Sequence, residues 1–304
     1  MSCLVKIAAG LMLLSSFWGC RTQRKISEYR PPACIRGKRI LKCSGLDDFN
    51  GLNVIEGELG DEPKFEGVKL FLNQSLKKFC TGVFVKKNIM VAPAQCFLAK
   101  PSYQNEIFLV KIKSLSKERD VRLKIVSVPI KVVINPAYKQ AVNQFGARSI
   151  KALAFDLAIV VFRESIVSKS KTFDLINRPI QKSSTLTWIG HGLPGVWASS
   201  ELWRRRTQVT VADSKYDSSL IEVDYSVRVT DQMQADKANL PATPGSILLS
   251  GNKAVGLFVG FSFQKYAFII ETNKRLLFAS FNNAINQEFL KEAIAENLLL
   301  LRSS

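Results

Sequence analysis

The sequence predicts an all-β domain that ends in one amphipathic helix. After about residue 52 the chain breaks into short runs in which apolar and polar residues alternate, as in 110–113 and 121–125, and turn residues separate the runs. Alternation with a period of two is typical of strands that have one solvent-facing side. The sequence has no strand–helix alternation and no internal repeat, which favours a β-sandwich or a β-barrel.

Further strands are predicted from runs of the same kind at 69–72, 83–85, 157–162, 186–189, 208–211, 246–249, 254–263 and 266–270. Only the end of the chain has the spacing of a helix, because apolar residues recur every three or four positions between 286 and 301. These apolar positions are Leu290, Ile294, Leu298 and Leu301.

The composition is that of a globular protein with a strongly basic surface. In 304 residues, 47% hydrophobic and 10% aromatic side chains suffice for one large core or two modest ones. Lysine and arginine number 43 against 25 acidic residues, a net charge of +18. This charge says nothing about the fold. It indicates either a polyanionic partner, such as nucleic acid, anionic lipid or an acidic polymer, or simply a well-solvated surface.

Residues 1–19 have the pattern of a signal peptide of the lipoprotein type. Lys6 precedes an apolar stretch, 7–18, that is too short to span a bilayer as a helix. The stretch ends at Gly19 and Cys20, which resembles the lipobox of bacterial lipoproteins and predicts lipidation of Cys20. Plain secretion is the alternative. Since Arg21 follows Cys20, the resemblance favours the outer membrane, with the protein facing the periplasm or the cell surface.

Residues 20–53 are predicted as a basic tether and 54–304 as the folded domain. Eight basic residues lie between Cys20 and Lys42 against the single acidic residue Glu28, and two prolines interrupt the segment. Next to a lipid anchor, such a segment is attracted to anionic headgroups. The other interpretation is a soluble linker that its charges keep solvated.

The cysteines support export. With Cys3 in the signal peptide and Cys20 as the lipid site, four cysteines remain in a compartment where disulfides persist. Four cysteines allow three connectivities. Their neighbourhood in the sequence favours one of these, Cys34 with Cys43 and Cys80 with Cys96.

Six motifs follow one another in an informative order: Cys80–Val85, Val91–Cys96, Ile134–Tyr138, Phe155–Val160, Trp188–Gly192 and Pro244–Gly260. Together they resemble the trypsin-like serine protease family over about residues 54–300, and Val54–Gly57 is similar to the family's mature N-terminus. The resemblance implies two six-stranded antiparallel β-barrels followed by a C-terminal helix. It also implies that Cys80 is bonded to Cys96 and that 134–138 forms a turn.

The resemblance also implies a damaged catalytic site. Asp156 takes the position of the triad aspartate, but Gln95 takes that of the histidine, and an amide cannot act as a general base near neutral pH. The family spacing places Pro244, which has no hydroxyl and no backbone N–H, at the nucleophile. A shift of two residues would place Ser246 there instead. The single histidine, His191, lies in another motif and is interpreted as structural.

We therefore expect a catalytically inactive trypsin-like homologue that is anchored in the cell envelope as a monomeric binding or scaffold protein. The expected partner is a protein or an anionic envelope polymer, with the membrane engaged through the N-terminal lipid and no specific nucleic acid. Two alternatives stay open: a hydrolase that uses Ser246, and an envelope protein that adheres to acidic polymer through charge alone. No cofactor or metal site is predicted, since the sequence has no zinc-type spacing and no phosphate-binding glycine loop.

Overall fold

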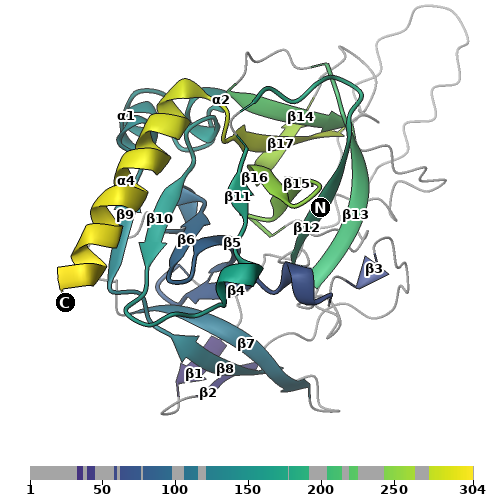
Figure 1. Cartoon of the computed structure of the whole chain (residues 1–304). Coiled ribbons are helices and arrows are strands. Elements are labelled where there is room, and N and C mark those ends of the chain that lie inside the picture. Colours follow the sequence, from purple (N-terminus) through teal and green to yellow (C-terminus); the bar gives the residue numbers. More distant parts are fainter. Residues whose placement is uncertain are drawn as a thin grey trace, which may run out of the picture. The chain divides into compact units, whose positions relative to one another are not determined.

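A computed structural model of the chain describes residues 33–36, 40–44, 58–59, 62–76, 78–97, 106–115, 121–176, 178–191, 204–213, 219–224, 243–263 and 274–303 (Figure 1). All of these lie in one compact unit, Pro31–Ser304. The predicted signal peptide, Cys20 and the predicted strand 266–270 lie outside the described residues. No helix in the described part of the chain has the length and hydropathy needed to cross a membrane.

The first sheet is antiparallel throughout and has the strand order β1-β2-β8-β7-β4-β5-β6-β10-β9. Its strands are β1 (Ala33–Arg36), β2 (Ile40–Ser44), β4 (Val68–Asn73), β5 (Lys78–Lys86), β6 (Ile89–Ala92), β7 (Ile107–Leu115), β8 (Val121–Ser127), β9 (Lys131–Ile134) and β10 (Ala158–Val161).

The second sheet closes on itself, because β16 pairs with both β15 and β17. The closed ring contains β12 (Thr185–His191), β13 (Arg204–Val211), β14 (Leu220–Asp224), β17 (Lys274–Ser280), β16 (Lys253–Phe263) and β15 (Ile247–Ser250). Two short strands flank this ring: β11 (Asp174–Leu175) lies parallel to β16, and β3 (Glu58–Leu59) pairs with β13.

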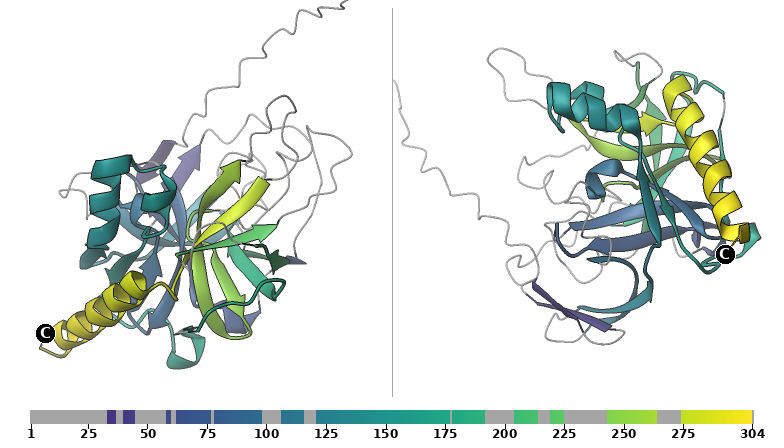
Figure 2. Two further views of the ribbon diagram at one scale, coloured as in Figure 1. Left: turned by 90° about the horizontal axis from the view of Figure 1, so that it is seen from above. Right: turned by 90° about the vertical axis from the view of Figure 1, so that its left-hand side faces the viewer.

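This architecture confirms the predicted double-barrel fold with a C-terminal helix, α4 (Ala284–Ser303) (Figures 1 and 2). The first sheet differs from the expectation in detail. In the described residues it has nine strands, and no pairing joins its edge strands β1 and β9, so this sheet forms a half-barrel. Strands β1 and β2 lie within the segment predicted as a tether, so residues 33–36 and 40–44 extend the folded domain toward the N-terminus.

A helix begins where the sequence predicted a turn at 134–138, and a second helix follows it. Helix α1 (Pro136–Phe145) begins at Asn135, whose Oδ1 accepts a hydrogen bond from the Ala137 N–H at 3.1 Å, and Pro136 occupies the first turn. The helix ends at Gly146, which has a positive φ of 83°. Helix α2 (Ile150–Leu153) then begins after Ser149, whose Oγ accepts from the Ala152 N–H. The cap at Asn135 and the proline that follows it explain why 134–138 is a helix start and not a turn.

The described part of the chain also contains three short 3-10 helices: η1 (Pro63–Phe65), η2 (Ala94–Cys96) and η4 (Lys169–Lys171). One apolar cluster runs between the two sheets and under α4, so the sheets and this helix share a core that includes Val91, Ile189, Leu257 and Leu290. Each sheet also has its own interior. In the second sheet this interior centres on the mutually packed rings of Trp188, Phe258 and Phe278.

Candidate functional site

A disulfide joins β5 to η2 at the centre of the candidate site. Cys80 and Cys96 are bonded, with an S–S distance of 1.98 Å and a separation of 16 residues, and both are fully buried. This confirms the predicted Cys80–Cys96 bond. For the second predicted pair, the backbone register places Cys34 opposite Cys43 on β1 and β2, as a bond between neighbouring strands requires, and that bond stays a prediction.

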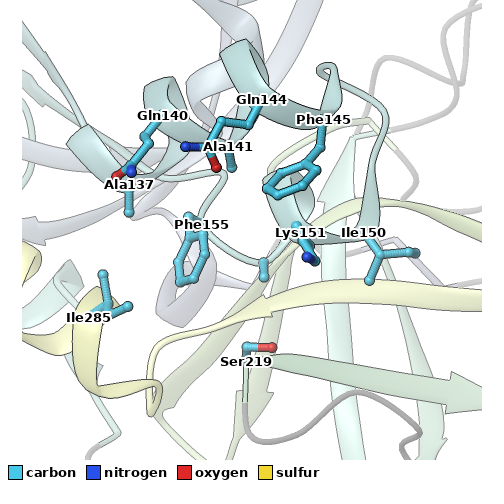
Figure 3. Close-up of a pocket in the computed structure, with 11 residues that line it drawn as sticks. Ala137, Gln140, Ala141, Gln144, Phe145, Ile150, Lys151, Phe155, Ser219 and Ile285 are labelled. Atoms are coloured by element: carbon cyan, nitrogen blue, oxygen red, sulfur yellow. The ribbon is translucent and has the colours of Figure 1, made fainter.

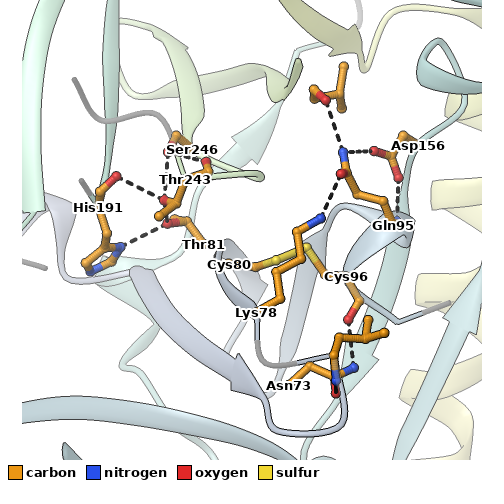
Figure 4. Close-up of a disulfide and its surroundings, with 12 residues drawn as sticks. Asn73, Lys78, Cys80, Thr81, Gln95, Cys96, Asp156, His191, Thr243 and Ser246 are labelled. Atoms are coloured by element: carbon orange, nitrogen blue, oxygen red, sulfur yellow. Dashed lines mark hydrogen bonds between the residues drawn. A yellow bond between two sulfur atoms is a disulfide. The ribbon is translucent and has the colours of Figure 1, made fainter. Parts of the chain in front are cut away.

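The first polar cluster surrounds the side chain of Gln95, which lies in η2. Asp156, fully buried before β10, accepts hydrogen bonds from the Gln95 backbone N–H at 2.7 Å and from its Nε2 at 2.6 Å. Gln95 Nε2 also donates to the carbonyl oxygen of Val259 at 3.0 Å. On the other side of the amide, Lys78 Nζ donates to Gln95 Oε1 at 2.9 Å (Figure 4). Because both N–H groups of the amide have acceptors, its orientation is determined.

Burial governs the charges in this cluster, which we name the amide cluster (Lys78, Gln95, Asp156). Burial raises the pKa of Asp156 to about 6, while the hydrogen bonds from Gln95 and the charge of Lys78 oppose the rise. Burial lowers the pKa of Lys78; the charge of Asp156 opposes that shift and the charge of Arg148 adds to it. Burial and Asp156 also raise the pKa of Tyr138, whose hydroxyl has no hydrogen-bond partner in the described part of the chain.

The second polar cluster, which we name the hydroxyl cluster, consists of Thr81, His191, Thr243 and Ser246. The Thr81 Oγ1 lies 3.0 Å from His191 Nδ1 and 2.6 Å from Thr243 Oγ1. Ser246 Oγ donates to the carbonyl oxygen of Thr243 at 2.7 Å and lies 3.2 Å from Thr243 Oγ1. No member of the cluster is more than 7% exposed. The imidazole of His191 is therefore buried, and its structural role stays a prediction.

Pro244 and Gly245 connect this cluster to the disulfide strand. The Pro244 carbonyl accepts a hydrogen bond from the Thr81 N–H at 2.8 Å, and the Gly245 N–H donates to the carbonyl of Phe258 at 2.7 Å. The Ser246 N–H donates to the Thr243 carbonyl. A donor that already serves a backbone carbonyl is not aimed at a substrate oxygen, so these two N–H groups do not form an oxyanion hole in this conformation.

The structure thus brings the predicted site residues into two groups. Asp156 contacts Gln95, Ser246 contacts Thr243, and no hydrogen bond joins Ser246 to Gln95 or Asp156 among the described residues. Sequence reasoning missed Lys78 and Thr81 as partners. Both flank Cys80 on β5, and this proximity to the predicted disulfide was the available signal. No group of three or more potential metal ligands occurs in the described ranges.

Comparisons with known proteins find the fold but no close relative. No family model and no curated protein sequence matches the chain. Among solved structures, an inactivated protease paralogue of the scabies mite, S-I1, aligns with a TM-score of 0.55 and 13% identity over 79% of this chain and 99% of its own. A structure named HBP aligns with a TM-score of 0.52 and 14% identity over 80% of this chain and 97% of its own.

A third similar structure is a point mutant of human heparin binding protein (CAP37), with a TM-score of 0.50 and 13% identity over 79% of this chain and 95% of its own. These neighbours have trypsin-like serine protease folds. At such low identity, the likeness establishes the fold alone.

Proposed function

We propose that this chain is a catalytically inactive homologue of the trypsin-like serine proteases that acts as an exported binding or scaffold protein. The observation that carries the proposal is the Gln95 side chain, which bonds Asp156, Val259 and Lys78 at once. In the family mechanism an imidazole must accept the proton of the nucleophile. An amide does not take up that proton at neutral pH, and this one is already engaged on both its nitrogen and its oxygen.

One contact supports the hydrolase alternative, and the burial of Ser246 argues against it. A chain of hydroxyls, Thr81 and Thr243, connects Ser246 to the ring of His191. Ser246, however, is 0% exposed and its hydroxyl donates to the Thr243 carbonyl. A nucleophile must reach a substrate carbonyl, so this conformation favours a structural role for Ser246.

For the partner we propose a protein or an anionic polymer of the cell envelope. In this proposal a lipid on Cys20 anchors the chain to the membrane and so places it near that partner. The net charge of +18 supports a partner of opposite sign, since it raises the local concentration of polyanions. One solved structure of this fold is named for binding heparin, an acidic polysaccharide. The N-terminal sequence pattern is the support for export and anchoring.

Inactivity is tested with a fluorophosphonate probe and a casein assay. The purified protein should neither be labelled nor cleave casein above background. Gln95→His alone should not restore activity. Gln95→His with Pro244→Ser should give no more than a trace of activity, which Asp156 would make possible by orienting the new imidazole. Labelling of the wild-type protein that Ser246→Ala abolishes would replace this proposal with the hydrolase.

Anchoring and polymer binding are tested separately. Cys20→Ser should move the protein from the membrane to the soluble fraction, and the N-terminal peptide of the wild type should carry acyl chains. Equal fractionation of both forms without an acyl mass would refute the anchor.

Retention on a heparin column should persist at low salt and decrease steeply as ionic strength rises, because counterions screen such contacts. Absence of retention at low salt would remove the acidic polymer from the proposal. Retention that persists in molar salt would indicate contacts other than charge.

A further inference from the structure

The helices α1 and α2 wall an apolar groove that neither polar cluster uses. Figure 3 shows α1 on one side of this hollow, Ile285 and Ser219 on the other, and the ring of Phe155 between them. The volume of the groove is about 510 Å³, within the range of ligand-binding pockets in proteins. Its walls come from three separate parts of the chain: α1 and α2 with the residues just after them, Ser219 immediately before β14, and the first turn of α4.

The groove has a floor of small side chains and a rim of large ones. Ala141 and Ala154 are 6% and 4% exposed and form part of the lining. Phe145 and Ile285, by contrast, are 50% and 46% exposed. A single exposed apolar side chain is ordinary on a protein surface, but two that border a hollow with an alanine floor provide a place for an apolar side chain of a partner.

The polar groups of the lining point to a peptide that carries negative charge. Gln140 and Gln144 are exposed, lie one turn apart on α1 and offer amide groups for a peptide backbone. The described lining residues include one charged side chain, Lys151, whose Nζ lies 4.2 Å from the centre of the Phe145 ring. No carboxylate is among these described lining residues. A cation placed over an aromatic ring at the rim can pair with an acidic side chain while the ring covers an apolar one.

We propose that this groove binds a segment of a partner protein in which apolar side chains are flanked by acidic ones. The inference rests on the proposed binding function and assigns it a surface and a partner class. Charge complementarity selects this occupant: Lys151 is the one charged side chain among the described lining residues and the whole chain carries +18, so an acidic segment is attracted while a second copy of this basic chain is disfavoured. Phe155 lines the groove and immediately precedes Asp156 of the amide cluster in the chain.

The test uses two fluorescently labelled peptides, acetyl-Glu-Leu-Phe-Leu-Glu-amide and its Lys-Leu-Phe-Leu-Lys counterpart, whose binding to the full protein is followed by anisotropy. The acidic peptide should bind with a dissociation constant of roughly 100 µM or lower at low salt, and the basic peptide at least about tenfold more weakly. Hydrogen exchange should slow in 136–153 when the acidic peptide is bound. Failure to bind the acidic peptide at about 1 mM would overturn the proposal.

Two matched pairs of variants locate the site. Lys151→Glu should weaken binding of the acidic peptide about tenfold, whereas Lys139→Glu, the same charge change on an exposed residue of α1 outside the lining, should weaken it less than about twofold. Phe145→Ala should weaken it about tenfold, and Val126→Ala, at a site 46% exposed outside the lining, should leave it unchanged. Equal effects within either pair would show binding by general charge or general hydrophobicity and would overturn the proposal.

Other occupants give distinct results. A concentration-dependent dimer that Phe145→Ala abolishes, without peptide binding, would assign the groove to a second copy and refute the inference. Heparin retention that persists while the acidic peptide fails to bind would refute the groove assignment and leave the proposed function in place. Loss of both would count against the binding function itself.

Discussion

The two polar clusters on either side of the Cys80–Cys96 disulfide are built by opposite means (Figure 4). The amide cluster is charged: the carboxylate of Asp156 and the ammonium of Lys78 contact opposite ends of the Gln95 amide. The hydroxyl cluster has three hydroxyls and one imidazole, contains no acidic side chain and is nearly inaccessible to solvent.

The difference teaches why the molecule is expected to be inactive even though it retains suitable residue types. A serine protease mechanism needs a carboxylate, an imidazole and a hydroxyl in one hydrogen-bonded series. Here the carboxylate belongs to one cluster, and the imidazole and the hydroxyls belong to the other. In each cluster the buried polar side chains form hydrogen bonds with their neighbours, because a buried polar group without a partner would destabilise the fold. Four perturbations separate the contributions of the two clusters.

The largest effect is expected at Gly245, which ties the hydroxyl cluster to the disulfide strand. Its φ is +91°, and a Cβ would lie 1.9 Å from the Thr81 carbonyl oxygen and 2.6 Å from Pro93 Cδ. Gly245→Ala should therefore lower the free energy of unfolding by about 4 kcal/mol in urea denaturation. Gly251→Ala is the matched control: its φ is +59° with no atom within 4 Å of the Cβ, so about 1 kcal/mol is expected. Equal losses of unfolding free energy in the two variants would show that a shift of the loop around residue 245 relieves the crowding of the new Cβ.

The disulfide between the clusters comes next. Replacing both Cys80 and Cys96 with serine should lower the free energy of unfolding by about 3 kcal/mol, the loop-closure value for a bond that spans 16 residues. Urea denaturation of the double variant checks this value. Reducing agent should destabilise the wild type more than the variant, in which only the second predicted pair, Cys34 and Cys43, is left to be reduced. A free thiol at either cysteine in oxidised protein would contradict the bond.

A pH dependence should distinguish the amide cluster from the hydroxyl cluster. The pKa of Asp156 is about 6 in the folded state and 3.8 in the absence of the fold, so the native state binds the proton more tightly. The contribution of Asp156 to stability is therefore highest at low pH, decreases as pH rises from about 4 to about 6, and is constant above that range. Relative to Asp156→Asn, which does not titrate, the wild type should lose about 2 kcal/mol between pH 4 and pH 7.

Denaturation midpoints of the wild type and of Asp156→Asn, measured at intervals across this range, check that prediction. Other carboxylates titrate in both proteins, so their contributions cancel in the difference. Parallel pH profiles would mean that Asp156 is ionised throughout and that Lys78 and Gln95 outweigh its burial. A pH profile of Ser246→Ala should run parallel to that of the wild type, because the serine hydroxyl does not titrate in this range and its hydrogen bonds go to Thr243.

The smallest effect is expected at Ser246. Removing its hydroxyl with Ser246→Ala deletes one buried hydrogen bond to the Thr243 carbonyl and should lower the free energy of unfolding by about 1 kcal/mol. Thermal and urea denaturation measure this loss, and heparin retention should not change. An unchanged stability would indicate that Ser246 Oγ is free for another role and would favour the hydrolase alternative.

Much of the fold could be predicted because its signals are local. Alternating apolar residues predict β8 and β16, and the spacing of Leu290, Ile294 and Leu298 predicts α4, since one buried face is enough to define each element. The helix α1 was missed although its cap, Asn135 followed by Pro136, is local as well. Residues 134–138 were interpreted as a turn because they resemble a turn motif of the family, although Asn135 and Pro136 also fit the start of a helix.

The sequence by itself determined the all-β class, the terminal helix and the Cys80–Cys96 bond, because each depends on periodicity or on a short separation along the chain. Only the tertiary structure decided which polar groups meet. Thr81 and His191 are 110 residues apart, Gln95 and Val259 are 164 apart, and the groove combines α1 with Ile285 of α4. Such contacts depend on how two sheets pack across a shared core, and no local pattern encodes that packing.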